Sequence, residues 1–286
     1  MTARTTVLAA LFALTLTSCG AGSAATTTTP SSTTTTTTTT TTKAPYPPAV
    51  DYAPSVPERT RKTAAGHQVN VCVPESLDPN VFTLTTSDGV RLSGLELGSG
   101  DRGVLLSHEQ GYYMCSWLAF GQELAAAGYH VVLLEYRNHG ASEKSEDNDN
   151  IDRDTRAALA ALHSFGADRV LLAGASCGGT ASAVTAADEP KLTGLLILSS
   201  PAQCAGMDGE AAARRITAPS FFAVSPEDYS GNMITHTRRL YEAAGSADKH
   251  LEIIPGGRHG TDMLREDNPE KLQKLIRDFV DSAFRR

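Results

Sequence analysis

The stretch Val170-Leu171-Leu172-Ala173-Gly174-Ala175-Ser176-Cys177-Gly178-Gly179 decides the fold of this chain. Its first four residues form an unbroken apolar run, which is typical of a strand buried on both faces of a parallel sheet. Only very small residues flank Ser176, as expected where a strand turns sharply into a helix. Such a turn would project the Ser176 hydroxyl beyond the carboxyl edge of the sheet. The pattern therefore predicts an α/β fold with Ser176 at its reactive edge.

Further short apolar runs occur at residues 104–106, 131–134, 195–198, 221–224 and 251–254. Segments with helical spacing lie between several of them, which indicates parallel strands joined by right-handed crossovers. The β-prone residues 81–85 and 90–97 flank Ser87-Asp88-Gly89 and predict an antiparallel hairpin. A last helix is expected with Asn268 as N-cap and Pro269 at its first position. We predict a mostly parallel central sheet that begins with this hairpin and has helices on both faces.

Residues 1–18 read as a signal peptide. Arg4 supplies the positive charge, and the apolar run from Val7 to Leu16 is shorter than the about 20 residues that span a bilayer as a helix. The following Leu16-Thr17-Ser18-Cys19 resembles a bacterial lipobox, which implies cleavage before Cys19 and transfer of a diacylglyceryl group to it. The alternative is an ordinary signal peptide in which Cys19 is incidental.

Residues 19–61 consist of the lipidated cysteine and a segment rich in threonine and proline, including the run Thr33–Thr42. This composition has too little apolar surface to offset the entropy of ordering, so we expect an extended, disordered stalk. Residues 62–286 have the composition and length of a single globular domain. The net charge is -7, and no run of lysine or arginine is present, so nucleic acid is not an expected partner.

A serine hydroxyl needs a base to act as a nucleophile. The glycine-rich segment Pro255-Gly256-Gly257-Arg258-His259-Gly260 follows the last apolar run and places His259 where that base is expected. Asp228 follows the strand expected at residues 219–224 and would orient the His259 ring and stabilise its protonated form. Glu227 is a neighbouring alternative for this acid, and Asp262 is a less favourable one.

The order of these elements, and of nucleophile, acid and histidine, resembles the α/β-hydrolase superfamily from about Phe82 to Phe284. The family's His-Gly-x-Gly turn, with tryptophan nine residues past its histidine, matches His108, Gly111 and Trp117, but Glu109 stands where glycine is usual. This resemblance implies that the backbone N–H groups of Gln110 and Cys177 form the oxyanion hole.

Residues 135–142, Glu-Tyr-Arg-Asn-His-Gly-Ala-Ser, resemble the family's Asp-x-Arg-Gly-x-Gly-x-Ser turn. In the family this turn buttresses the loop of the nucleophile. The resemblance implies that His139 is structural, and His108 is also expected to be structural rather than catalytic.

Cysteine is the nucleophile in dienelactone-hydrolase-like relatives, but here Ser176 occupies the centre of the turn and Cys177 lies one position further on. Apart from Cys19 the chain has four cysteines, Cys72, Cys115, Cys177 and Cys204, and an even number in an exported domain suggests disulfides. Of three possible pairings we predict Cys115–Cys177, bracing the oxyanion loop against the nucleophile turn, and Cys72–Cys204. Free buried thiols are the alternative.

The connection from Leu198 to Pro219 leaves no room for a helical lid. The acidic residues between Glu143 and Asp154 lack the glycine and closing glutamate of a calcium-binding loop. We expect no metal and no other cofactor. The sequence thus predicts a membrane-anchored, extracytoplasmic serine hydrolase, a carboxylesterase acting on small-molecule or envelope esters. The alternatives are a peptidase or acyltransferase acting on cell-envelope material, and a non-catalytic envelope-binding protein on the same scaffold.

Overall fold

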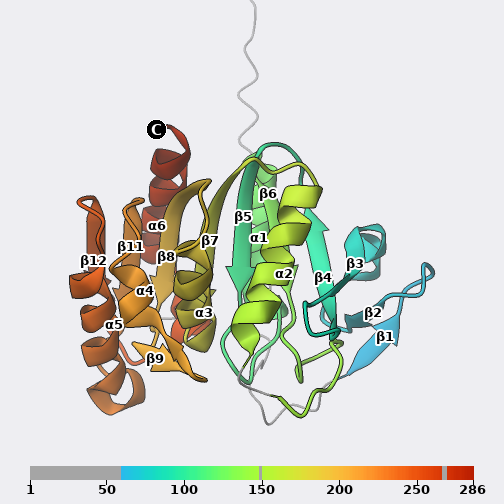
Figure 1. The fold of residues 1–286 in the computed structure, drawn as a ribbon, viewed down its shortest axis with the longest axis horizontal. Coiled ribbons are helices and arrows are strands. Elements are labelled where there is room, and N and C mark those ends of the chain that lie inside the picture. Colours follow the sequence, from blue (N-terminus) through green and yellow to red (C-terminus); the bar gives the residue numbers. More distant parts are fainter. Residues whose placement is uncertain (1–58, 148–149, 266–268) are drawn as a thin grey trace, which may run out of the picture. The chain divides into compact units, whose positions relative to one another are not determined.

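The computed structural model describes residues 59–147, 150–265 and 269–286 (Figure 1). The predicted signal peptide, Cys19 and nearly all of the predicted stalk lie outside the described residues, as does the predicted N-cap Asn268. The first strand, β1 (Thr60–Lys62), begins just ahead of residue 62, where the sequence places the start of the domain. Within the described ranges, no helix is both long and apolar enough to cross a membrane.

An eight-stranded sheet with the order β12-β11-β8-β7-β5-β6-β4-β3 forms the centre of the domain. The N-terminal hairpin of β3 and β4 is antiparallel, β4 also runs antiparallel to β6, and all other neighbours are parallel. The predicted mostly parallel sheet with an antiparallel start is confirmed. Its strands are β3 (Val81–Thr85), β4 (Arg91–Leu97), β5 (Arg102–Ser107), β6 (His130–Leu134), β7 (Arg169–Ala175), β8 (Leu192–Leu198), β11 (Ser220–Val224) and β12 (Lys249–Ile253).

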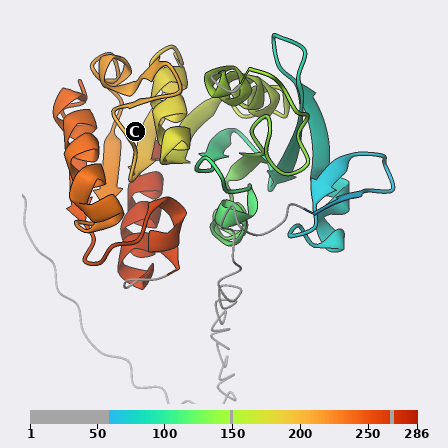
Figure 2. The same cartoon turned by 90° about the horizontal axis from the view of Figure 1, so that it is seen from below.

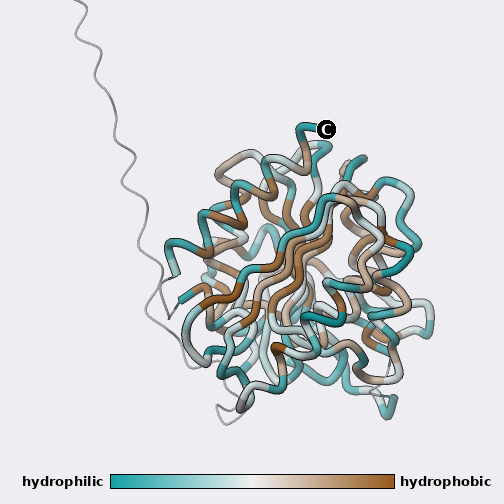
Figure 3. Tube along the Cα trace, turned by 90° about the vertical axis from the view of Figure 1, so that its left-hand side faces the viewer, coloured by the Kyte–Doolittle hydropathy of each residue, from teal (hydrophilic) through white to brown (hydrophobic). Residues whose placement is uncertain are grey.

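Helices cover both faces of this sheet, as Figure 2 shows with the sheet between them. The helices are α1 (Cys115–Ala126) and α6 (Pro269–Phe284) on one face, and α2 (Ile151–Ser164), α3 (Cys177–Ala186), α4 (Gly209–Ala213) and α5 (Asn232–Ala243) on the other. Successive strand residues point to opposite faces, so Val104 joins the core beneath α1 and α6 while Leu105 joins the core beneath α2 and α3. This explains the unbroken apolar runs, which lie in the middle of the fold in Figure 3.

Two short hairpins were not predicted. One pairs β1 with β2 (Gln68–Asn70), and the other pairs β9 (Gln203–Cys204) with β10 (Met207–Asp208). Each of these strands has two or three residues, which is too few to show a period in the sequence. The β9–β10 hairpin and α4 together occupy the connection from β8 to β11, where the sequence leaves no room for a helical lid.

Two disulfides are present, as predicted, but the predicted pairing is wrong. Cys72 is bonded to Cys115 and Cys177 to Cys204, with Cα–Cα distances of 6.2 and 5.6 Å. Cys115 and Cys177 both follow strand ends at the carboxyl edge, but Cys115 packs in the core on the α1 face and Cys177 in the core on the α3 face. The sheet separates these two cores, so each cysteine pairs with a partner on its own face.

Candidate active site

Ser176 occupies the sharp turn between β7 and α3, as the sequence predicts. Its backbone has φ 51° and ψ -130°, a strained conformation for a residue with a side chain. A hydrogen bond stabilises this conformation: the Ser176 N–H donates to the carbonyl oxygen of Leu198 at 2.9 Å. A Cβ atom on Gly174 would lie 2.3 Å from the carbonyl oxygen of Gly178. The turn is therefore possible only because glycine stands at that position.

The nucleophile turn packs directly on the loop that follows β5. A Cβ atom on Gly178 would lie 2.2 Å from the carbonyl oxygen of His108, so only glycine permits this approach. Gln110 also lies beside the start of α3, with its Oε1 atom 3.6 Å from Cys177 Sγ. The backbone N–H of Gln110 has no hydrogen-bond partner among the described residues. Cys177 is the first residue of α3, and the first N–H groups of a helix have no partner within it. Within the described residues, the two N–H groups predicted for the oxyanion hole therefore lie on neighbouring segments.

Two neutral histidines hold the loop after β5. His108 is fully buried; its Nε2 accepts the N–H of Tyr136 at 3.1 Å, so its proton is on Nδ1, which donates to the carbonyl oxygen of Glu109 at 2.7 Å. His139 Nε2 likewise accepts the N–H of Gly111 at 2.9 Å. Burial lowers the pKa of His108 to about 3. Both histidines make structural hydrogen bonds, as expected. Through these bonds residues 135–142 support the loop after β5, whereas the family resemblance implies that they buttress the loop of the nucleophile.

His259 lies against Asp228. Its Nδ1 atom is 3.0 Å from both carboxylate oxygens of Asp228, which is fully buried at the start of the turn after β11. The Tyr229 ring packs on the imidazole, with centroids 4.5 Å apart. Because Asp228 is a hydrogen-bond acceptor, it places the proton of the neutral ring on Nδ1 and leaves Nε2 able to accept one.

The two alternative carboxylates, Glu227 and Asp262, have other hydrogen-bond partners or face solvent. The Glu227 side chain is exposed, and its backbone N–H donates to the carbonyl oxygen of Gly256. Asp262 accepts the hydroxyl of Tyr112 at 3.0 Å and pairs with Arg265. Neither carboxylate contacts the His259 ring among the interactions of the described residues, so the geometry selects Asp228.

The loop that carries His259 also packs on the nucleophile turn. A Cβ atom on Gly260 would lie 3.2 Å from the Cβ of Ala175, so the residue after the histidine contacts the residue before the serine. Ser176 Oγ makes no hydrogen bond to His259 within the described part of the chain. Catalytic hydrogen bonds are often long in an enzyme without its substrate, so the arrangement is compatible with a serine–histidine–aspartate set.

A family model described as the alpha/beta hydrolase fold matches residues 104–244. Together with the sheet order and the turn at Ser176, this match decides the fold. The chain has the α/β-hydrolase fold. No curated protein matches this α/β hydrolase significantly in sequence.

Solved structures of several esterases and of a lipase share the fold of this chain. An esterase from a Rhodococcus species has a TM-score of 0.61 at 15% identity, over 71% of this chain and 99% of its own. A monoacylglycerol lipase from Paleococcus ferrophilus has a TM-score of 0.60 at 16% identity, over 67% and 99%. An esterase from Pyrococcus furiosus has a TM-score of 0.58 at 17% identity, over 71% and 89%. At these identities the likeness shows the common fold.

Glu109 makes hydrogen bonds to the His259 loop that the sequence does not predict. The sequence marks it only as a departure from the glycine usual at that position. In the structure its side chain is 1% exposed and accepts hydrogen bonds from the backbone N–H and the hydroxyl of Thr261. Thr261 lies two residues after His259, more than a hundred residues from Glu109 in sequence, so no local pattern could have revealed the contact.

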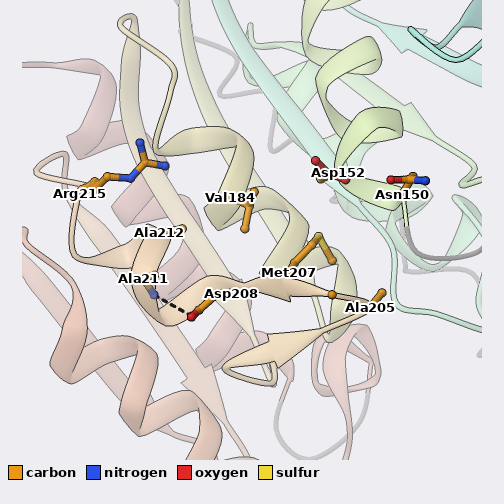
Figure 4. A pocket seen from close by; sticks show the side chains of 10 residues that line it. Asn150, Asp152, Val184, Ala205, Met207, Asp208, Ala211, Ala212 and Arg215 are labelled. Carbon is orange, nitrogen blue, oxygen red and sulfur yellow. Dashed lines mark hydrogen bonds between the residues drawn. The ribbon is translucent and has the colours of Figure 1, made fainter.

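A cavity of about 640 Å³ lies between the start of α2, α3 and the β9–β10 hairpin (Figure 4). Ser176, Asp228 and His259 do not line it. Two of its charged residues have structural partners, since Asp208 caps α4 by accepting the Ala211 N–H and Arg215 pairs with Asp188. These two charges are therefore accounted for by the fold, and the candidate active site at the carboxyl edge of the sheet is separate from this cavity.

Proposed function

We propose that this protein is a serine hydrolase that cleaves carboxylic esters through an acyl-enzyme. The observation that carries the proposal is the His259–Asp228 pair, with Nδ1 3.0 Å from the carboxylate, on a loop that packs against the strained turn of Ser176. A buried carboxylate that fixes the proton on Nδ1 leaves Nε2 ready to act as a base. The fold likeness to esterases supports the choice of substrate class.

The mechanism begins with attack of Ser176 Oγ on the ester carbonyl carbon while His259 Nε2 takes the hydroxyl proton. The negative charge that develops on the carbonyl oxygen is bound by the N–H groups of Cys177 and Gln110. The C–O bond then breaks, and the departing alcohol receives the proton from His259. A water molecule, deprotonated by the same histidine, then attacks the acyl-enzyme. The bond to Ser176 Oγ breaks, His259 returns the proton to this oxygen, and the carboxylic acid is released.

We also propose that the enzyme works outside the cytoplasm, anchored to the membrane through a lipid on Cys19. The lipobox-like residues 16–19 and the two disulfides support this, because disulfides persist in oxidising compartments. Cys19 lies outside the described residues. Expression in a bacterial host with labelled palmitate tests the anchor: the wild type is expected in the membrane fraction carrying the label, and Cys19→Ala without it. Label retained by Cys19→Ala would contradict the anchor.

A fluorophosphonate probe tests the chemistry, because it reacts with activated serines. We expect labelling of the wild type, none of Ser176→Ala, and full labelling of Ser164→Ala, a matched control whose exposed hydroxyl only bonds the Ala161 carbonyl oxygen at the end of α2. Hydrolysis of p-nitrophenyl esters of short and long acyl chains then establishes ester cleavage. Labelling without ester hydrolysis would favour a peptidase or acyltransferase, and a wild type that is not labelled would exclude a serine hydrolase.

A further inference from the structure

Glu109 is a buried carboxylate in the loop between β5 and α1. Its Oε1 atom accepts the backbone N–H of Thr261 at 2.7 Å and the Thr261 hydroxyl at 2.5 Å, and Oε2 accepts the Ser116 hydroxyl at 3.3 Å. Burial raises the pKa of Glu109, while its hydrogen bonds from Thr261 act in the opposite direction. Taking a carboxyl group out of water costs free energy, so a buried one is stable only when hydrogen-bond donors lie beside it.

These contacts join the two loops that the proposed reaction requires. Glu109 directly precedes Gln110, whose N–H is the second oxyanion donor, and Thr261 is two residues past His259. A Cβ atom on Gly260 would lie 2.5 Å from Glu109 Oε1, so the carboxylate also lies against the residue between His259 and Thr261. Glycine at position 109 would leave the N–H and hydroxyl of Thr261 buried without an acceptor.

One other side chain joins the same two loops, since the Tyr112 hydroxyl donates to the side chain of Asp262 at 3.0 Å. The remaining supports lead to other parts of the fold. His108 and His139 tie the loop after β5 to the segment after β6. Asp228 ties the His259 ring to the turn after β11. Of the side chains described here, Glu109 is the one whose hydrogen bonds link the oxyanion loop to the backbone of the histidine loop.

We propose that Glu109 is a positioning residue that sets the distance between the oxyanion donor Gln110 and the base His259. The proposal rests on the proposed function. Because the Glu109 side chain is 1% exposed, it does not touch substrate, and its removal acts on the alignment of the reacting groups rather than on substrate binding. Its loss is therefore expected to lower kcat and to leave KM nearly unchanged.

The test compares Glu109→Ala, Glu109→Gln and Thr261→Val in the full chain, with active sites counted by fluorophosphonate titration. A displacement of about 1 Å between reacting groups costs about 100-fold in rate, so Glu109→Ala is expected to lose about 100-fold in kcat per titrated site. Glu109→Gln keeps an oxygen that accepts the Thr261 N–H, and we expect a loss of about 10-fold or less. Thr261→Val keeps the N–H bond and loses the hydroxyl bond, so it is expected to lie between wild type and Glu109→Ala.

Ser116→Ala is the matched control, because it removes the bond of the same carboxylate that points to α1 instead of to the histidine loop. Its kcat is expected within about 2-fold of wild type. The double variant of Glu109→Ala and Thr261→Val is expected to be no slower than Glu109→Ala alone, since both remove one connection. A merely structural role would lower the melting temperature and the number of titrated sites but not kcat per site.

Two results would overturn the proposal: Glu109→Ala and Thr261→Val with kcat per titrated site within about 2-fold of wild type, or losses that multiply in the double variant. If Glu109→Ala does not fold, Thr261→Val against Ser116→Ala decides the question by the same criteria. A wild type that neither binds the fluorophosphonate nor hydrolyses esters refutes the proposed function instead, so the two failures are distinguishable.

Discussion

Acid should destabilise this protein through His108, the buried histidine of the loop after β5. The Tyr136 N–H donates to His108 Nε2, so a second proton on the ring would bring two donors against each other. Burial lowers the pKa of His108 from its ordinary value of 6.5 to about 3. In the unfolded chain the same ring takes up its proton near the ordinary value.

The sign and size of the effect follow from this difference. Between pH 6.5 and about 3 the unfolded chain binds a proton that the folded chain does not. The contribution of neutral His108 to the free energy of unfolding is therefore fully present above this window and is lost as the pH falls through it. Each pH unit in the window costs about 1.4 kcal/mol. At about pH 5 the loss from His108 alone is therefore about 2 kcal/mol.

The assay is urea unfolding, followed by circular dichroism at about pH 7.5 and about pH 5, for wild type and His108→Gln. A glutamine amide can donate to the Glu109 carbonyl and accept the Tyr136 N–H but does not titrate. The drop in unfolding free energy between the two pH values is expected to be about 2 kcal/mol smaller in the variant. Other titrating groups contribute equally to both proteins and cancel. The same drop in both proteins would refute the reasoning.

Three further changes test other parts of the structure. Asp228→Asn removes the acceptor that fixes the His259 proton and is expected to lower kcat about 10⁴-fold, whereas Glu227→Gln, which changes an exposed side chain, is expected to leave p-nitrophenyl ester hydrolysis unaltered. Replacing both Cys177 and Cys204 by serine opens a loop with a sequence separation of 27; calorimetry is expected to show a loss of about 3 to 4 kcal/mol in unfolding free energy, and a loss below about 1 kcal/mol would contradict this. Gly178→Ala places a Cβ 2.2 Å from a carbonyl oxygen of the oxyanion loop and is expected to abolish activity in a protein that still folds by circular dichroism.

The central fold could be predicted from the sequence because its signals are local. In an unbroken run such as residues 170–173, the side chains that point to either face of the strand are apolar. Such a strand is buried on both faces of a sheet. The small residues around Ser176 are required by the backbone of that one turn, and Gly128, with φ 87°, ends α1 for a similarly local reason. Strand order along the chain then follows from the handedness of the connections.

Tertiary structure alone decided which distant residues meet. Asp228 rather than Glu227 faces His259 because of how the turn after β11 packs, and the composition of that turn does not distinguish the two carboxylates. The cysteines pair as Cys72–Cys115 and Cys177–Cys204 because the sheet separates its two faces.

The strained turn at Ser176 is thus a property of ten consecutive residues. The sequence by itself determines it, because a strained backbone dictates the size of its immediate neighbours. The surroundings that would make the turn reactive depend on the packed sheet. The Glu109 carboxylate and its Thr261 partner are brought within hydrogen-bond distance only when β5 and β12 lie in the same sheet. A buried carboxylate is stable only beside such donors, and no spacing within a single segment supplies them.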